Sequence, residues 1–205
     1  MIICLEGING SGKTFLADVL MDRWMALGGR DARKLEPVQG TAFGRGIFAA
    51  IMSTTDLNPD AETLAFASAR LHAASMVAPG ANDLIVLERW AGAVVAYGTV
   101  SGTDPELLAS LESILLSSMA INHTVVVDVS GQTATQRLSI QSGRNRFEMN
   151  GPDYLENVRR CYLDWARCHA PATIASGTMS CPEYVTWATD LINTLMDDQQ
   201  NAVAS

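Results

Sequence analysis

GINGSGKT, residues 7–14, is the stretch of sequence that decides the fold, and it directly follows the apolar run MIICL at residues 1–5. It fits the pattern G-x-x-x-x-G-K-[ST], in which glycines let backbone N–H groups turn inward around phosphate oxygens. The lysine of this pattern reaches the outer phosphates, and the final hydroxyl holds Mg²⁺. The residues expected to contact a nucleotide phosphate chain are Gly7, Asn9, Gly10, Ser11, Gly12, Lys13 and Thr14.

The residues on either side of this loop have the pattern that a phosphate-binding loop requires. The apolar run before it is typical of a short buried strand, and Phe15, Leu16, Leu20 and Trp24 recur after it at helical spacing. A helix that begins at the loop points its positive end toward the bound anion. This context argues against the alternative interpretation, a glycine-rich turn without a ligand.

Length and charge limit the possible classes of protein. The chain has 205 residues, 48% of them hydrophobic, which predicts a single domain over residues 1–205. A net charge of −8 provides no general basic surface for a polynucleotide, so no nucleic-acid partner is expected. A local cationic patch in an acidic protein indicates a small anionic ligand instead. The arginines that gather late in the chain are Arg137, Arg144, Arg146, Arg159, Arg160 and Arg167.

Cysteine spacing and the apolar start argue against several other classes. The 4 cysteines show no C-x-x-C spacing and the 3 histidines are scattered, so we expect neither a zinc site nor a disulfide framework. The apolar start is too short to span a membrane and lacks a basic leading region. Its removal as a signal peptide would destroy the phosphate-binding loop. We therefore expect a cytoplasmic protein without membrane contact.

Apolar runs alternate with helical patterns along the rest of the chain. Further strands are expected at residues 84–87 and 124–129, with shorter ones at 33–35 and 173–174. Helices are expected near residues 47–52 and over 58–77, 104–119, 154–168 and 183–196, with a capping box of Thr133 and Gln136 opening another. The alternation predicts a three-layer α/β fold with a parallel five-stranded sheet. The tail after residue 197 is expected to be frayed.

With these segments in place, the chain resembles the thymidylate kinases, a family of P-loop nucleoside monophosphate kinases. The similar segments cover nearly the whole chain and occur in the family's order: LEGINGSGKT, LEPVQGT, ETLAFASARLHAA, IVLERWAGAVVAY, VVVDVSGQTATQRL and RNRFEMNGPDYLENVRRCYLDWA. The resemblance implies the P-loop kinase fold. It also implies that ATP lies over the phosphate-binding loop and that a deoxynucleoside monophosphate lies opposite.

The resemblance assigns residues to phosphoryl transfer, a reaction that needs charge neutralisation and alignment more than covalent chemistry. Arg89 matches the arginine that binds the acceptor phosphate, and arginine forks onto phosphate better than lysine does. Glu88 stands where the family has an aspartate, so it is expected to hold Mg²⁺ or to orient Arg89. Lys13 completes this part of the catalytic set. A solvated surface pair is the alternative interpretation of Glu88 and Arg89.

Arg144 and Arg146 fall in the segment that resembles the family's lid, at about residues 140–152. The lid closes on ATP and brings positive charge to the γ-phosphate. Some relatives carry that arginine in the phosphate-binding loop, but residues 9–11 contain none, so the lid must supply it. The alternative is that the two arginines only keep the loop soluble.

The family also implies how the acceptor is bound. Phe66 and Arg70 lie four residues apart on one helix face; in the family, the aromatic ring stacks on the base and the guanidinium donates to a carbonyl oxygen. Without the family, Phe66 would be interpreted as a core residue. Tyr97 matches a tyrosine that lies against the sugar, and Glu36 and Pro37 match a loop near the acceptor phosphate.

Three positions depart from the family. Asn9 replaces a carboxylate that receives the sugar 3′-hydroxyl, Val94 replaces a polar side chain near the base, and Leu35 replaces an arginine. These changes are expected to affect base selectivity more than phosphoryl transfer, because a base pocket that loses a hydrogen-bonding group discriminates less. The resemblance implies a homodimer that uses ATP and Mg²⁺ to convert dTMP to dTDP. The alternative acceptor is another or a modified pyrimidine deoxynucleotide.

Two other functions remain open at this point. The segments EPV and ER also resemble the deoxynucleoside kinases, in which a glutamate acts as a base toward the 5′-hydroxyl. A nucleotide-binding protein that kept the fold but lost turnover is the second. The presence of Lys13, Thr14, Arg89 and the lid arginines argues against this second alternative.

Overall fold

The computed structural model describes residues 1–78, 80, 83–140, 146–169 and 171–204, with only the backbone described at 146, 148, 200 and 202–204. At its centre is a sheet of five strands: β1 Ile2–Glu6, β2 Asp31–Leu35, β3 Asp83–Glu88, β4 His123–Asp128 and β5 Ala172–Ser176. The order across the sheet is β2-β3-β1-β4-β5, and all neighbouring strands are parallel. The parallel five-stranded sheet expected from the sequence is therefore confirmed.

The first strand occupies the middle of the sheet because every one of its side chains is apolar or buried. Its register places Leu5 beside Glu88 of β3 and Glu6 beside Val126 of β4. The carboxyl ends of the parallel strands meet at one edge of the sheet, which is where open α/β folds bind their ligands. The phosphate-binding loop leaves β1 at the centre of that edge.

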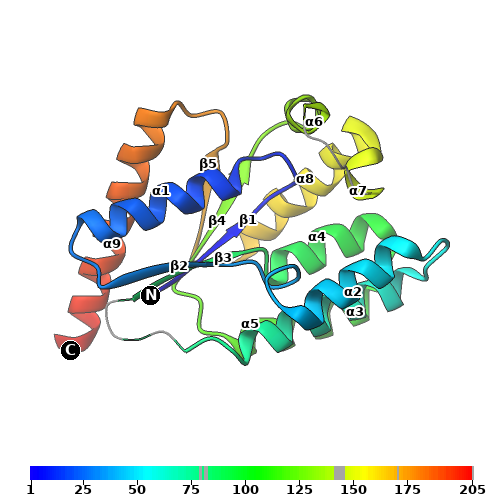
Figure 1. Cartoon of the computed structure of the whole chain (residues 1–205), viewed down its shortest axis with the longest axis horizontal. Coiled ribbons are helices and arrows are strands. Elements are labelled where there is room, and N and C mark those ends of the chain that lie inside the picture. Colours follow the sequence, from blue (N-terminus) through cyan, green and yellow to red (C-terminus); the bar gives the residue numbers. More distant parts are fainter. Residues whose placement is uncertain (79, 81–82, 141–145, 170, 205) are drawn as a thin grey trace.

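Helices cover both faces of the sheet, which gives three layers (Figure 1). The helices are α1 Lys13–Ala26, α2 Ala42–Ser53, α3 Pro59–Ala74, α4 Ala91–Ser101, α5 Pro105–Ser118, α6 Gly131–Ser139, α7 Arg146–Met149, α8 Gly151–Cys168 and α9 Cys181–Ala204. On one face Ile3 and Leu5 pack with residues of α1 and α9. On the other face Ile2 and Cys4 pack with residues of α3, α4, α5, α6 and α8. Alternate side chains of β1 therefore build the two cores.

Several elements differ from the sequence-based expectations. Helix α4 was not expected from the sequence. It is apolar on all sides and has no side-chain N-cap, so it lacks both the periodicity and the capping residue that mark a helix start. The capping box expected at Thr133 is wrong, because the hydroxyl of Ser130 caps α6 by accepting from the Thr133 N–H at 3.1 Å.

The last helix is longer than the sequence indicates. The backbone of α9 continues past Asp197 to Ala204, where the sequence predicts a frayed tail, and no glycine or proline interrupts that stretch. Within the residues that the structure describes, no helix combines the length and the apolar character needed to cross a membrane.

Candidate active site

The phosphate-binding loop is held in a shape that only glycine permits at three positions. Gly7, Gly10 and Gly12 have φ angles of 130°, 77° and 102°, which side chains rarely adopt. A Cβ on Gly7 would lie 2.5 Å from the carbonyl oxygen of Val127, and one on Gly10 would lie 2.8 Å from that of Ala134. The loop is therefore packed tightly against β4 and α6. This contact fixes its backbone before any ligand is bound.

Lys13 begins α1, and its side chain folds back over the loop. Its ammonium group donates to the carbonyl oxygens of Gly7 at 3.0 Å and Ile8 at 2.8 Å. Burial lowers the pKa of Lys13 well below the ordinary lysine value, and repulsion from Arg89 adds to this effect. A phosphate anion placed at the loop would counter both effects, because a nearby negative charge favours the charged form of the amine.

Thr14 and Glu88 come together at the carboxyl ends of β1 and β3, as the candidate metal site requires. The Thr14 hydroxyl donates to Glu88 Oε2 at 3.2 Å, and Glu88 Oε1 lies 3.9 Å from the Lys34 ammonium group. Among the described residues, no group of three or more His, Cys, Asp or Glu side chains could hold a metal. A hydroxyl and one carboxylate next to a phosphate loop suit Mg²⁺, which usually keeps several waters and takes its other ligands from substrate phosphates.

Arg89 follows β3 directly and lies at the centre of the site. Its φ angle of 70° is unusual for a residue with a side chain, which indicates that the surroundings force this conformation. Its guanidinium donates to the Gly7 carbonyl at 2.6 Å, to the Tyr162 hydroxyl at 3.1 Å and to the Asn9 side-chain oxygen. Burial would lower the pKa of Arg89, but Tyr97, Tyr162 and other neighbours raise it above the ordinary value. Arg89 is thus a permanent, oriented positive charge.

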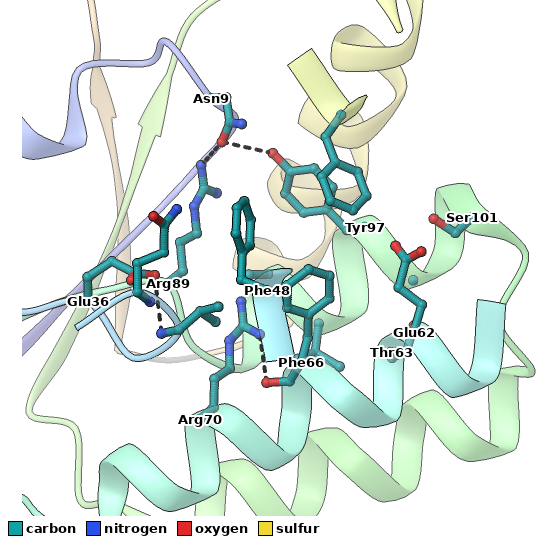
Figure 2. Close-up of a pocket in the computed structure, with 16 residues that line it drawn as sticks. Asn9, Glu36, Phe48, Glu62, Thr63, Phe66, Arg70, Arg89, Tyr97 and Ser101 are labelled. Atoms are coloured by element: carbon teal, nitrogen blue, oxygen red, sulfur yellow. Dashed lines mark hydrogen bonds between the residues drawn. The ribbon is translucent and has the colours of Figure 1, made fainter. Parts of the chain in front are cut away.

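A first pocket opens beside Arg89 and extends along α3 and α4. Figure 2 shows Arg89 and Asn9 at one end of this pocket and Glu62 and Ser101 at the other. The residues that line it are Asn9, Glu36, Val38, Gln39, Phe48, Glu62, Thr63, Phe66, Arg70, Arg89, Ala93, Val94, Tyr97, Gly98, Ser101 and Phe147. The pocket thus has a polar, cationic end next to the phosphate loop and an aromatic interior.

The residues expected to bind the acceptor gather in this first pocket, with one exception. The buried Arg70 guanidinium donates to the Phe66 carbonyl at 3.1 Å, and its central carbon lies 5.8 Å from the centre of the Phe66 ring. The carboxylate of Glu36 accepts from the backbone N–H groups of its own loop, at Val38 and Gln39. Pro37 is buried and does not line the pocket, although residues on both sides of it do.

A second pocket lies over the phosphate-binding loop. It is lined by Asn9, Gly10, Gly12, Lys13, Thr14, Phe15, Glu88, Arg89, Arg137, Leu138, Gly177, Met179 and Tyr184. Asn9 and Arg89 line both pockets, so the two cavities meet at the Arg89 guanidinium. Two anionic ligands seated in these pockets would face each other across one fixed cation.

Arg137 is a site residue that sequence reasoning identified only as a member of the arginine cluster. Its guanidinium donates to the carbonyl oxygens of Gly10 at 3.1 Å, Ser11 at 3.2 Å and Gly177 at 2.9 Å, and it lines the second pocket. It therefore braces the loop while presenting a charge to the ligand. Its position on the helix after β4 could have suggested this, since α6 begins at the same sheet edge as the loop.

Two other arginines of the cluster, Arg159 and Arg167, pair with carboxylates outside the two pockets. Arg159 forms a two-pronged pair with Asp128, at 2.5 and 2.9 Å, and a further contact with Glu156 at 2.7 Å. Arg167 pairs with Asp164 on the same helix at 2.6 Å, with both side chains exposed. These arginines are structural.

The two lid arginines are not placed by the structure. Arg144 lies outside the described residues, and Arg146 begins α7 with its side chain outside them. The expectation that they act on the γ-phosphate stays a prediction.

Two aromatic residues of the first pocket, Phe147 and Phe48, were not identified from the sequence. Phe147 on α7 packs its ring 5.9 Å from those of Phe66 and Tyr97. Phe48 on α2 lines the same cavity. The segment RNRFE places Phe147 within the expected lid, which was the available signal that a lid side chain reaches the acceptor pocket.

A parallel sheet with a phosphate loop after its central strand, facing a second pocket across a shared arginine, defines a P-loop nucleotide kinase. The profile of one family, Thymidylate kinase, matches residues 5–181. The thymidylate kinase of Pseudomonas fluorescens is 30% identical over 169 residues, 80% of each chain, and that of Methylococcus capsulatus is 30% identical over 169 residues, 80% of this chain and 81% of the relative. That of Thermosipho melanesiensis is 24% identical over 96% of this chain and 100% of the relative. The chain belongs to the thymidylate kinase family.

Membership in this family indicates the type of reaction and the phosphate donor. Thymidylate kinases are ATP-dependent nucleoside monophosphate kinases, and the family uses ATP with a divalent metal. The comparisons do not favour a deoxynucleoside kinase, the alternative left open by the sequence.

Proposed function

We propose that this chain transfers the γ-phosphoryl group of MgATP to thymidine 5′-monophosphate, giving ADP and thymidine 5′-diphosphate. The observation that carries the proposal is the pair of pockets that share Asn9 and Arg89. A donor in the pocket over the loop and an acceptor in the pocket along α3 would present their phosphates to each other there. In-line transfer requires this arrangement.

The second pocket, which is the proposed donor pocket, supplies the positive charge that such a transfer needs. Lys13 would bind the outer phosphates of ATP, and Arg137 would add a second cation at the loop. Thr14 and Glu88 would hold Mg²⁺, which supplies neutralisation of phosphate charge when bound. Preorganised cations of this kind stabilise a transition state because they need not reorient during the reaction.

The first pocket, which is the proposed acceptor pocket, has side chains that would suit a pyrimidine nucleotide. Phe66 would stack on the base, and Arg70 would donate to one of its carbonyl oxygens. Tyr97, whose hydroxyl lies 3.5 Å from the Asn9 side-chain oxygen, would lie against the sugar. Arg89 would bind the acceptor phosphate and hold it opposite the donor.

The apolar side chain of Val94 supports a wider choice of base. It lines the pocket and is 3% exposed, so this wall offers no hydrogen bond to a base edge. Another or a modified pyrimidine deoxynucleotide is therefore the second candidate acceptor.

Family membership also supports a cytoplasmic homodimer. Sedimentation of the purified protein would test whether it is a dimer.

An assay of ADP release over a panel of acceptors tests the proposal. The panel comprises the deoxynucleoside and ribonucleoside monophosphates and thymidine itself, each with MgATP. We expect the highest kcat/KM with thymidine monophosphate and no turnover of thymidine. Lys13→Ala is the control for contaminating kinases. Intact ATP binding without turnover of any monophosphate would overturn the proposal, and turnover of thymidine alone would establish a nucleoside kinase instead.

A further inference from the structure

Glu6, the last residue of β1, is a buried carboxylate that the roles above leave unused. Its side chain is 0% exposed, and it directly precedes the phosphate-binding loop. Its Oε1 atom accepts from the backbone N–H groups of Trp90 at 2.7 Å and Ala93 at 3.2 Å. These groups belong to the start of α4, which has no side-chain cap of its own. Glu6, at the end of β1, thus caps α4, which follows the neighbouring strand β3.

The contact between Glu6 and the start of α4 depends on the absence of a side chain at Gly92. A Cβ on Gly92, in the first turn of α4, would lie 3.0 Å from Glu6 Oε1 and 3.1 Å from Trp165. A larger residue at position 92 would require the Glu6 carboxylate or Trp165 to shift. The helix that is fixed in this way carries Tyr97 and Val94 into the acceptor pocket.

Capping alone does not explain why the residue carries a charge. A glutamine oxygen could accept the same two hydrogen bonds, and burial of a charge is unfavourable unless opposite charges compensate it. Within the described part of the chain, Glu6 Oε2 and Arg70 Nε are both buried without a hydrogen-bond partner.

Five titratable groups interact electrostatically with Glu6. They are Cys4 on β1, Lys13 at the loop, Arg70 on α3, Arg89 after β3 and Tyr162 on α8. Burial raises the pKa of Glu6, and the Trp90 N–H, Arg70 and Arg89 oppose this rise. Burial lowers the pKa of Arg70, and repulsion from the positive charge of Arg89 adds to this effect. An ionised Glu6 attracts both guanidiniums, because it contributes to raising the pKa of Arg70 and of Arg89.

We propose that Glu6 is a positioning residue for the acceptor nucleotide, whose negative charge keeps Arg70 and Arg89 in the acceptor pocket while its Oε1 atom fixes the start of α4. The inference rests on the proposed function, because it assigns the two guanidiniums to the acceptor base and phosphate. It predicts that loss of the charge weakens acceptor binding more than ATP binding.

Two substitutions separate the charge from the cap. Glu6→Gln keeps an oxygen that can accept from the N–H groups of Trp90 and Ala93 but removes the charge. Glu6→Asp keeps the charge, but its side chain is one methylene shorter, so the carboxylate lies farther from these two N–H groups. KM for thymidine monophosphate and for ATP is measured for both, with thermal unfolding to confirm folding. Glu112→Gln is the matched control, since Glu112 is a partly buried carboxylate that binds Trp165 and His169 and lines neither of the two pockets.

We expect Glu6→Gln to raise the acceptor KM about tenfold, equivalent to about 1.4 kcal/mol, with a change in ATP KM of less than about twofold. Glu6→Asp should lie between the wild type and Glu6→Gln, and Glu112→Gln should match the wild type. The inference is overturned if Glu6→Asp is the more damaging variant, if both KM values rise together, or if neither variant folds. A wild-type protein that does not phosphorylate thymidine monophosphate would instead defeat the proposed function.

Discussion

The two pockets of this protein are built in opposite ways. The donor pocket is centred on one run of the chain, residues 7–14, whose glycines set the backbone; side chains from the end of β3, from α6 and from α9 surround that run. The acceptor pocket takes side chains from the loop after β1, the loop after β2, and helices α2, α3, α4 and α7. The centre of the donor pocket is specified by the local backbone geometry of one segment, whereas the acceptor pocket depends throughout on the packing of several elements.

Arg89 belongs to both pockets and joins the two kinds of construction. It reaches the Gly7 carbonyl on the donor side and contacts the ring of Tyr97, 5.6 Å away, on the acceptor side. Substitutions within the loop should therefore act on the donor, substitutions along α3 on the acceptor, and substitution of Arg89 on both.

Lys13→Ala should have the largest effect. It removes the cation that the loop presents to the outer phosphates, so kcat should fall by about 10³-fold, the order seen when a preorganised charge-stabilising group is lost. Steady-state kinetics with saturating acceptor would measure it. An unchanged rate in the purified variant would show that the activity comes from another protein.

Arg89→Ala should lower kcat/KM for the acceptor by about 10²-fold to 10³-fold and also reduce kcat at saturating ATP. Arg89→Lys should recover little, because an ammonium group cannot make the forked contacts of a guanidinium with Asn9, Gly7 and a phosphate. Full recovery by the lysine variant would show that charge alone, and not geometry, is needed.

Arg70→Gln should act on the acceptor side only. We expect the KM for thymidine monophosphate to rise about tenfold to a hundredfold with ATP KM unchanged, as for loss of a charged hydrogen bond of about 1.5–3 kcal/mol. The preference for thymine over cytosine nucleotides should narrow. An equal rise in ATP KM would contradict the separation of the two pockets.

Glu156→Gln should have the smallest effect and should leave catalysis intact. The Gly131 N–H and Arg159 lower the pKa of Glu156 below its ordinary 4.5. A carboxyl with a depressed pKa stabilises the fold above the ordinary value and loses that contribution as pH falls through the folded-state value. Thermal unfolding should show a loss of about 1 kcal/mol at neutral pH and a shallower decline below pH 4.5. A steeper acid decline in the variant would contradict this role.

The same division explains how much the sequence could predict. The phosphate-binding loop, the four later strands and the long capped helices follow from local signals such as the Asn58 and Asp104 caps. The assignment of Phe66, Arg70 and Tyr97 to the acceptor required the family resemblance, because an aromatic residue on a helix face is equally compatible with the core. The structure places all three around one cavity.

The features that escaped prediction depend on contacts between distant residues. The start of α4 has no local cap because Glu6, more than eighty positions earlier in the chain, provides it at separations of 84 and 87 residues. Arg137 is separated by 127 and 126 residues from the carbonyls of Gly10 and Ser11 that it binds. No periodicity or spacing in a single sequence encodes such pairs.

The most direct test of two pockets meeting at Arg89 is the affinity of one ligand that spans both. In this ligand adenosine and thymidine are joined through five phosphates, and titration calorimetry would measure its binding to the wild type and to Arg89→Ala. The account predicts one ligand per chain, bound at least about a hundredfold more tightly than ATP or thymidine monophosphate alone, and loss of most of that gain in the variant. A ligand that binds no more tightly than ATP would contradict it.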